Sequence, residues 1–135
     1  MGTQVMADYF FDTSVLVAYF KEEDAYTVEA VESVLNGEGA GSISAITVAE
    51  ICAASDMDDP GLRERRLAVL SLLNVMIVDA SIAERGGELR RQHNLALPDA
   101  LIAACAEKVD GRFLTKDPHF SRLLKAGILQ GEVYE

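Results

Sequence analysis

Short apolar runs alternate with helix-type apolar spacings along the chain. Four short runs, at residues 8–11, 42–45, 75–78 and 112–115, have the length and apolar content of β-strands. The run at 75–78 is the clearest, because it consists of four consecutive apolar residues between polar neighbours. We therefore predict four short strands, separated by longer segments.

The longer segments have the spacing of helices. Apolar residues at positions 28, 31 and 35 share one face of a predicted helix over residues 25–36, and Gly37 is placed to end it. Thr47 and Ser81 each stand three residues before a glutamate, which is the capping-box spacing of a helix start. Helices are also expected after the first strand and over residues 47–54, 60–74, 81–93, 98–109 and 117–127.

Strands that alternate with helices are typical of a parallel sheet covered by helices on both faces. The predicted fold class is therefore α/β. The chain of 135 residues contains no repeat, no low-complexity tract and no long linker, so we expect a single domain over residues 1–135.

Composition excludes several classes of protein. Half of the residues are hydrophobic, which argues against disorder, and the longest apolar runs are too short to span a bilayer. The N-terminus lacks the pattern of a signal peptide, so we expect a cytoplasmic protein without a membrane partner. Cys52 and Cys105 are too few for a disulfide framework or a closed zinc site, and both are expected to be buried thiols.

The chain is strongly acidic, with 22 acidic and 12 basic side chains and a formal net charge of −10. A protein that grips a nucleic-acid backbone usually carries a broad basic surface, which this composition does not provide. Any contact with a polyanion must therefore be local, through a small arginine cluster or through bound cations.

Four carboxylates share one position in the predicted fold. Asp12, Glu50, Asp99 and Asp117 each lie at the start of a helix, or in its first turn. Taken singly, each is explained by helix capping, which is worth about 0.5–2 kcal/mol. Taken together, they fall along one edge of a parallel sheet, where they repel one another unless cations neutralise them. Oxygen ligands without histidine or cysteine suit Mg²⁺ or Mn²⁺, so we predict a divalent-metal site.

Four segments around these carboxylates resemble the signature blocks of PIN domains. They read FDTS at 11–14, TVAEI at 47–51, LPDALIAA at 97–104 and LTKDPHF at 114–120. Their order, their spacing and the chain length are similar to those of VapC-type toxins, the ribonuclease half of type II toxin–antitoxin pairs. The block around Asp99 is the most specific of the four.

The resemblance implies a three-layer α/β/α fold with a five-stranded parallel sheet, and Mg²⁺- or Mn²⁺-dependent cleavage of RNA by a metal-activated water. Asp12 and Asp99 would be the principal metal ligands, and Asp117 and Glu50 would complete the cluster, partly through water. One of these last two would accept the proton of the water, and the choice stays open. Family members commonly form homodimers and are inhibited by a separately encoded antitoxin laid across the active-site groove.

Hydroxyl and basic residues near the blocks are candidates for substrate contacts. Ser14 and Thr115 match hydroxyl positions that orient Asp12, a water or a phosphate, although local turn bonding explains them equally well. Arg90 and Arg91 are the best candidates for holding an RNA phosphate, because they precede the Asp99 block. The two histidines, at positions 93 and 119, are expected to be surface or packing residues.

Two other interpretations remain. A catalytically silent PIN-like module would bind RNA or protein without cleaving anything. A receiver-type phosphoacceptor domain would use Asp79, Thr115 and Lys116 instead, but that interpretation leaves Glu50 and Asp99 without a role. In the ribonuclease interpretation, Asp79 is structural.

Overall fold

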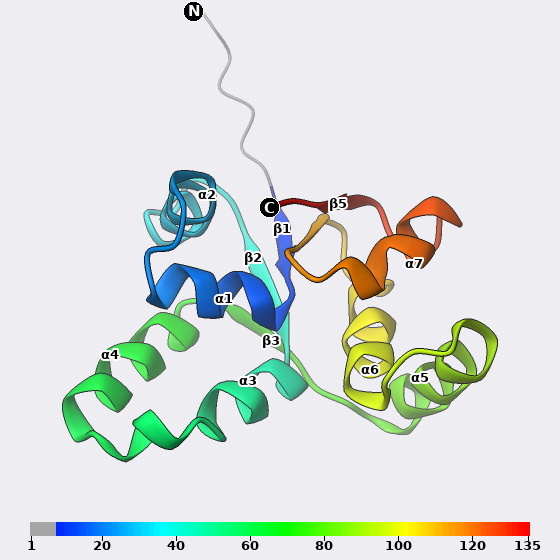
Figure 1. Cartoon of the computed structure of the whole chain (residues 1–135), viewed down its shortest axis with the longest axis horizontal. Helices are drawn as coiled ribbons and strands as arrows, with labels where there is room; N and C mark the ends of the chain where they lie inside the picture. The colour runs from blue at the N-terminus through cyan, green and yellow to red at the C-terminus, as the bar shows by residue number, and fades with distance from the viewer. Residues whose placement is uncertain (1–7) are drawn as a thin grey trace, which may run out of the picture.

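The computed structural model describes residues 8–135 and contains one parallel sheet (Figure 1). Its five strands lie in the order β3-β2-β1-β4-β5, and every neighbouring pair is parallel. The strands are β1 (Tyr9–Phe11), β2 (Gly41–Ser44), β3 (Asn74–Met76), β4 (Arg112–Thr115) and β5 (Gly131–Val133). The α/β class and the parallel sheet are confirmed.

Helices fill the connections between the strands. Seven α-helices are described: α1 (Thr13–Phe20), α2 (Ala25–Leu35), α3 (Ala45–Cys52), α4 (Pro60–Ser71), α5 (Ala80–His93), α6 (Leu97–Ala106) and α7 (Ser121–Lys125). Two short 3-10 helices, η1 (Ser55–Asp58) and η2 (Pro118–Phe120), precede α4 and α7.

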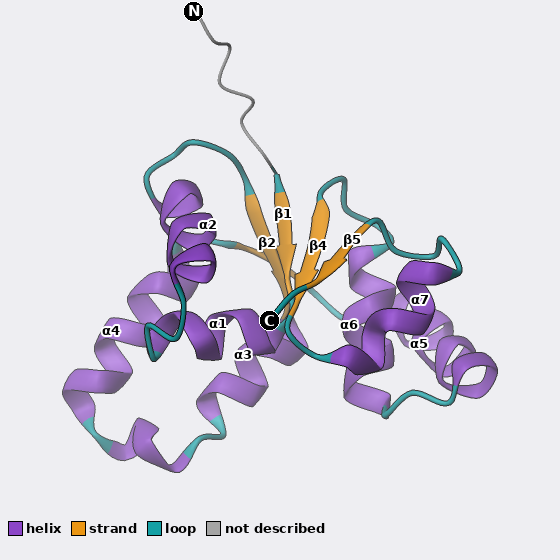
Figure 2. Ribbon diagram, turned by 45° about the horizontal axis from the view of Figure 1, so that its top comes forward, coloured by secondary structure: helices purple, strands orange, loops and turns teal. Residues whose placement is uncertain are grey.

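The sheet separates two apolar layers, because successive strand side chains point to opposite faces. Phe10 and Phe113 belong to one buried cluster, which also contains residues of α5, α6 and α7. Phe11 and Leu114 belong to the other, with residues of α1, α2 and α4. In Figures 1 and 2 the helices α1–α4 lie on one side of the sheet and α5–α7 on the other. The predicted three-layer arrangement is therefore confirmed.

Two predicted helix starts are wrong, and both for the same reason. The α3 helix is capped by Ser44, whose Oγ accepts the Ile46 N–H at 3.0 Å, so Thr47 lies inside the helix. The α5 helix is capped by Asp79, whose Oδ1 accepts the Ile82 N–H at 2.9 Å. A capping residue needs an extended backbone, which the residue at the end of a strand or loop already has. Each helix therefore begins after the first residue that can cap it, and not at the capping box that follows.

Burial at the sheet edge also differs from the prediction. Only Val75 and Met76 of the run at 75–78 belong to β3, which has one neighbouring strand and lies at the edge of the sheet. Val75, in this edge strand, is 44% exposed, and Ile77, which follows the strand, is 72% exposed. Cys105 is buried as expected, but Cys52, the last residue of α3, is exposed. The strand β5 was not predicted from the residue pattern, since its three residues carry no clear apolar run.

Within residues 8–135, none of the helices combines the length and the apolar character needed to cross a bilayer. The expectation about a signal peptide depends on the N-terminal residues, of which 1–7 lie outside the described part of the chain.

Candidate active site

The strand order places a topological switch point between β1 and β4. The chain winds outward from β1 through β2 to β3, and then returns to β4 and β5 on the other side. Open parallel sheets bind ligands at such a switch point, beyond the carboxyl ends of the strands. Asp12 follows β1 directly, and its N–H donates to the carbonyl of Leu114 in β4 at 3.0 Å. The ends of these two strands therefore bring Asp12 against Thr115.

Asp12 is the most deeply buried carboxylate of the site, with 3% of its surface exposed. Its Oδ2 accepts three hydrogen bonds: from the backbone N–H of Ser14 at 3.3 Å, from Ser14 Oγ at 2.7 Å, and from Thr115 Oγ1 at 2.8 Å. Burial raises the pKa of Asp12, and these hydrogen bonds oppose the rise. Oδ1 has no such partner in the described residues, so one oxygen is fixed and the other is left for a ligand.

The hydroxyls of Ser14 and Thr115 link Asp12 to the backbone of the loop after β4. Ser14 Oγ accepts the N–H of Lys116 at 2.9 Å, and Thr115 Oγ1 accepts the N–H of Asp117 at 2.9 Å. Both hydroxyl protons point to Asp12, so the geometry favours the orienting role among the three that the sequence left open. The loop after β4 and the start of α1 are thereby tied to one carboxylate.

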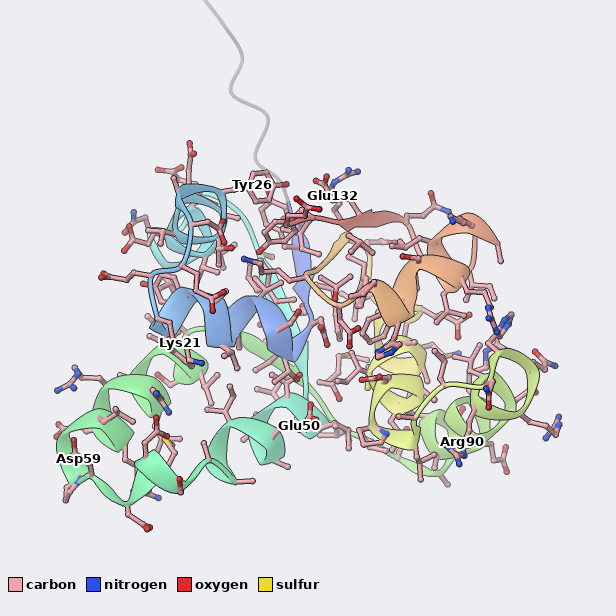
Figure 3. All side chains as sticks on the ribbon, in the orientation of Figure 1. Lys21, Tyr26, Glu50, Asp59, Arg90 and Glu132 are labelled. Atoms are coloured by element: carbon pink, nitrogen blue, oxygen red, sulfur yellow. The ribbon has the colours of Figure 1, made fainter. Side chains whose placement is uncertain are left out.

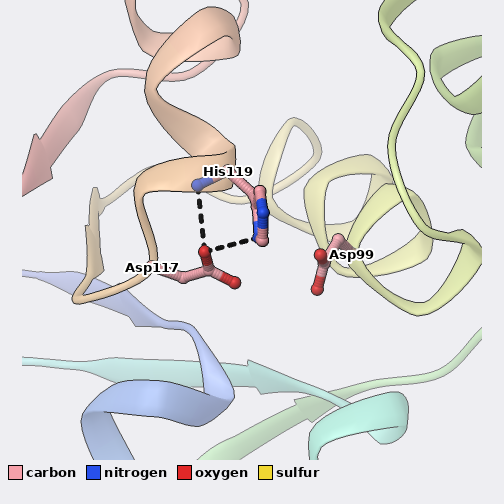
Figure 4. A group of neighbouring side chains, drawn as sticks. All are labelled: Asp99, Asp117 and His119. Carbon is pink, nitrogen blue, oxygen red and sulfur yellow. Dashed lines mark hydrogen bonds and ion pairs between the residues drawn. The ribbon is translucent and has the colours of Figure 1, made fainter.

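Asp117 and His119 lie beside each other at the start of η2, as Figure 4 shows. Asp117 Oδ1 accepts the N–H of His119 at 2.9 Å and lies 2.9 Å from its Nδ1. Potential ligand atoms of Asp99, Asp117 and His119 all fall within 4.8 Å of one another. His119 is on the surface, as expected, but sequence reasoning missed its position at the site. Its place two residues after Asp117 was the available signal.

Asp99 lies in the first turn of α6 and faces this pair (Figure 4). Desolvation, followed by the negative charges of Asp117, Asp12 and Glu50 in that order, raises the pKa of Asp99 to about 6. All four predicted carboxylates therefore act on one site. Burial is the largest cause of the shift, and the repulsion expected from the sequence adds to it.

Glu50 reaches the site from the last turn of α3, not from its first turn as predicted (Figure 3). Thr13 Oγ1 donates to Glu50 Oε1 at 2.7 Å, and the buried Thr47 hydroxyl lies 2.8 Å from the same Thr13 oxygen. Thr47, which was predicted to cap α3, instead supports this contact between α1 and α3.

The predicted arginines lie elsewhere. Arg90 Nη1 donates to the carbonyl of Leu95 at 2.8 Å and so holds the connection between α5 and α6. Arg91 is exposed in the last turn of α5. Their contact with RNA stays a prediction that the structure does not test.

The donor set fits a divalent cation. Among residues 8–135, no lysine or arginine forms an ion pair with any of the four carboxylates, and the nearest one in sequence, Lys116, pairs with Asp24 at 2.6 Å instead. No basic side chain therefore fills the centre of the cluster. Carboxylates that are fixed, partly desolvated and uncompensated suit a hard cation such as Mg²⁺ or Mn²⁺. The same pairing keeps Lys116 away from Asp79, which argues against a receiver-type site.

Comparison with solved structures finds toxin–antitoxin complexes of this fold. VapBC2 from Rickettsia felis, bound to a DNA fragment from its promoter, superposes with a TM-score of 0.73 at 22% identity, over 95% of this chain and 99% of that chain. DNA-bound VapBC from Salmonella typhimurium gives 0.69 at 23% identity, over 95% and 98%. A toxin–antitoxin complex from Klebsiella pneumoniae gives 0.66 at 27% identity, over 84% and 90%.

Sequence comparison assigns the family. No curated protein matches the chain significantly. The model of the PIN domain family, however, matches residues 9–125, which include all four blocks and nearly the whole described fold. The chain therefore belongs to the PIN domain family.

Proposed function

We propose that this protein is a Mg²⁺- or Mn²⁺-dependent endoribonuclease of the VapC type, built as one PIN-like domain. The observation that carries the proposal is the convergence of four carboxylates at the switch point of the sheet, where three of them raise the pKa of Asp99. Such a cluster destabilises the protein unless it holds a cation, which is the pattern of a functional site rather than of helix capping.

In this proposal Asp12 and Asp99 hold the ion, and Asp117 and Glu50 complete its surroundings, partly through water. When bound, the ion supplies Lewis acidity to the phosphodiester and to the attacking water. Ser14 and Thr115 keep Asp12 oriented, so that Oδ1 faces the ligand.

The proton of the attacking water needs an acceptor, and the chain offers two. Glu50 and Asp117 each have one oxygen engaged, by Thr13 and by His119 respectively. A proton on Asp117 also has a path to solvent, because the imidazole of His119 lies 2.9 Å away with a side chain that is 78% exposed.

The similar solved structures also support a proposal about the proteins that this chain binds. The three solved structures described above are toxin–antitoxin complexes, two of them bound to DNA. We propose that this chain is likewise the toxin of a pair, inhibited by a separately encoded antitoxin that covers the active-site groove, and that it forms a homodimer.

Metal dependence tests the proposal most directly. We expect the purified chain to cleave labelled single-stranded RNA with Mg²⁺ or Mn²⁺, and to stop when the ion is chelated. Asp99→Asn, purified identically, controls for a contaminating nuclease, because it removes one ligand charge and leaves the size of the side chain unchanged. Equal cleavage by both proteins would assign the activity to a contaminant. Absence of cleavage on a broad set of RNAs would favour the catalytically silent module.

The hydroxyl that supports Asp12 gives a second prediction. Thr115→Val keeps the shape of the side chain but removes the donor to Asp12 Oδ2. Because residues behind metal ligands typically contribute 10–100-fold to affinity, we expect Mg²⁺ binding to weaken by about tenfold. Thr115→Ser is the matched control, since it restores the hydroxyl. Isothermal calorimetry of both variants measures the effect, and equal affinities would mean that the hydrogen bond does not position Asp12.

A further inference from the structure

A cleft of about 650 Å³ opens beside the acidic site, on the side of the sheet covered by α5–α7. The connection between α5 and α6 forms one wall and the helix α7 forms another. Asp99 and His119 belong to its lining, so the cleft is continuous with the proposed metal site. A volume of this size lies within the range of clefts that bind small ligands or parts of larger ones.

The cleft is basic although the protein is acidic. Arg122 and Lys125, one turn apart on α7, line it together with His93 at the end of α5. Asp99 is the one carboxylate in that lining. The formal net charge of the whole chain is −10, so this concentration of positive side chains runs against the general composition.

These two charges are not neutralised by neighbours. Four other basic side chains of the described residues form ion pairs with carboxylates, namely Arg66, Arg85, Arg112 and Lys116. Within residues 8–135, neither Arg122 nor Lys125 forms an ion pair with a carboxylate. Arg122 donates one hydrogen bond, from Nη1 to the carbonyl of His93 at 3.2 Å, and a guanidinium has five N–H groups to offer.

Charge and position together identify the ligand. A phosphodiester that reaches the acidic cluster carries further phosphates along its backbone, and unpaired cations beside the cluster bind those phosphates. The acidic remainder of the surface repels the same backbone, which directs it to this cleft. We propose that Arg122 and Lys125 form a phosphate-binding subsite for the RNA backbone next to the scissile bond. This inference rests on the proposed ribonuclease function.

The subsite is distinct from the one expected from the sequence, which stays a prediction. Arg90 and Arg91 were predicted to hold phosphate, but neither lines the cleft. The basic residues that line the cleft, Arg122 and Lys125, lie on α7. The short sequence of this helix did not indicate that it faces the start of α6.

The test compares two double variants of the full chain, each of which removes two positive charges. R122A/K125A removes them from the cleft, and R63A/R65A removes them from α4. Arg63 and Arg65 are exposed, lie on the opposite side of the sheet, and carry the same two charges. Steady-state cleavage of one labelled single-stranded RNA with Mg²⁺ is measured over a range of salt concentrations. R122K/K125R, which keeps both charges, serves as the rescue variant.

We expect R122A/K125A to raise KM by about tenfold, as loss of two charge-assisted contacts predicts. The slope of log(kcat/KM) against log[salt] should become shallower by about 1.4, since each phosphate contact on a single strand contributes about 0.7. R63A/R65A should change neither quantity, and R122K/K125R should recover most of the KM.

Equal effects of the two alanine pairs would overturn the subsite, because the cleft would then matter only through net charge, while the ribonuclease function would stand. A wild-type chain that cleaves no RNA would overturn both. A change in kcat with an unchanged KM would also overturn the subsite, since it would place the two side chains in the chemical step.

Discussion

Asp12→Asn is expected to lower RNA cleavage by about a thousandfold, which corresponds to about 4 kcal/mol of transition-state stabilisation. The three donors around Oδ2 dictate how the new amide lies, because its oxygen must accept from Ser14 and Thr115. The amide nitrogen then takes the place of Oδ1. A negatively charged acceptor that faces the site is replaced by a neutral donor, which repels a cation.

The measurement combines RNA cleavage with calorimetry of Mg²⁺ and Mn²⁺ binding. Asp79→Asn is the matched control. Asp79 also follows a strand, but it caps α5, and asparagine caps a helix as well as aspartate does. We expect the control to cleave and bind metal like the wild type. Metal binding retained by Asp12→Asn would remove Asp12 from the ligand set.

Asp99→Asn is expected to raise the free energy of unfolding of the metal-free protein at neutral pH, although the substitution abolishes RNA cleavage. The pKa of Asp99 is raised to about 6 from an ordinary 3.8, so the folded state holds a proton that the unfolded state has lost over this interval. The free energy of unfolding therefore falls as the pH rises from about 4 to 6, and it stays low above. The asparagine variant does not undergo this loss.

The size of that effect follows from the shift. A pKa shift of about two units corresponds to about 3 kcal/mol of unfolding free energy. Screening by solvent around the half-buried carboxyl reduces this to about 1–2 kcal/mol. Urea unfolding in chelator at pH 7.5 should show the variant as more stable, and at pH 4 the difference should vanish. Asp110→Asn, at an exposed loop residue, is the control. A gain that is the same at both pH values would contradict the electrostatic cause.

Added Mg²⁺ should reverse the order of stability. A ligand that binds only the folded state stabilises it by RT ln(1 + [L]/Kd), so Mg²⁺ far above its Kd should stabilise the wild type more than the weaker-binding Asp99→Asn. The cluster is thus a place where the chain gives up stability for a site that a cation completes.

The sequence alone determined the α/β class, four of the five strands and the identity of the four carboxylates. These features depend on local patterns, namely apolar runs, helical spacing and acidic residues after strands. Such patterns survive in any arrangement that buries the apolar faces. The blocks around Asp12, Asp99 and Asp117 were informative for the same reason, since each places its carboxylate within a residue or two of a helix start.

The tertiary structure decided what each local pattern faces. Val75 is exposed because β3 lies at the sheet edge, Ile77 is exposed just beyond that strand, and Cys52 is exposed at the last residue of α3. Glu50 approaches Asp99 from the last turn of α3, His119 lies beside Asp99 in η2, and Arg122 lines the adjoining cleft from α7. Exposure, ion pairing and pKa depend on neighbours that are distant in sequence, so only the packed chain specifies them.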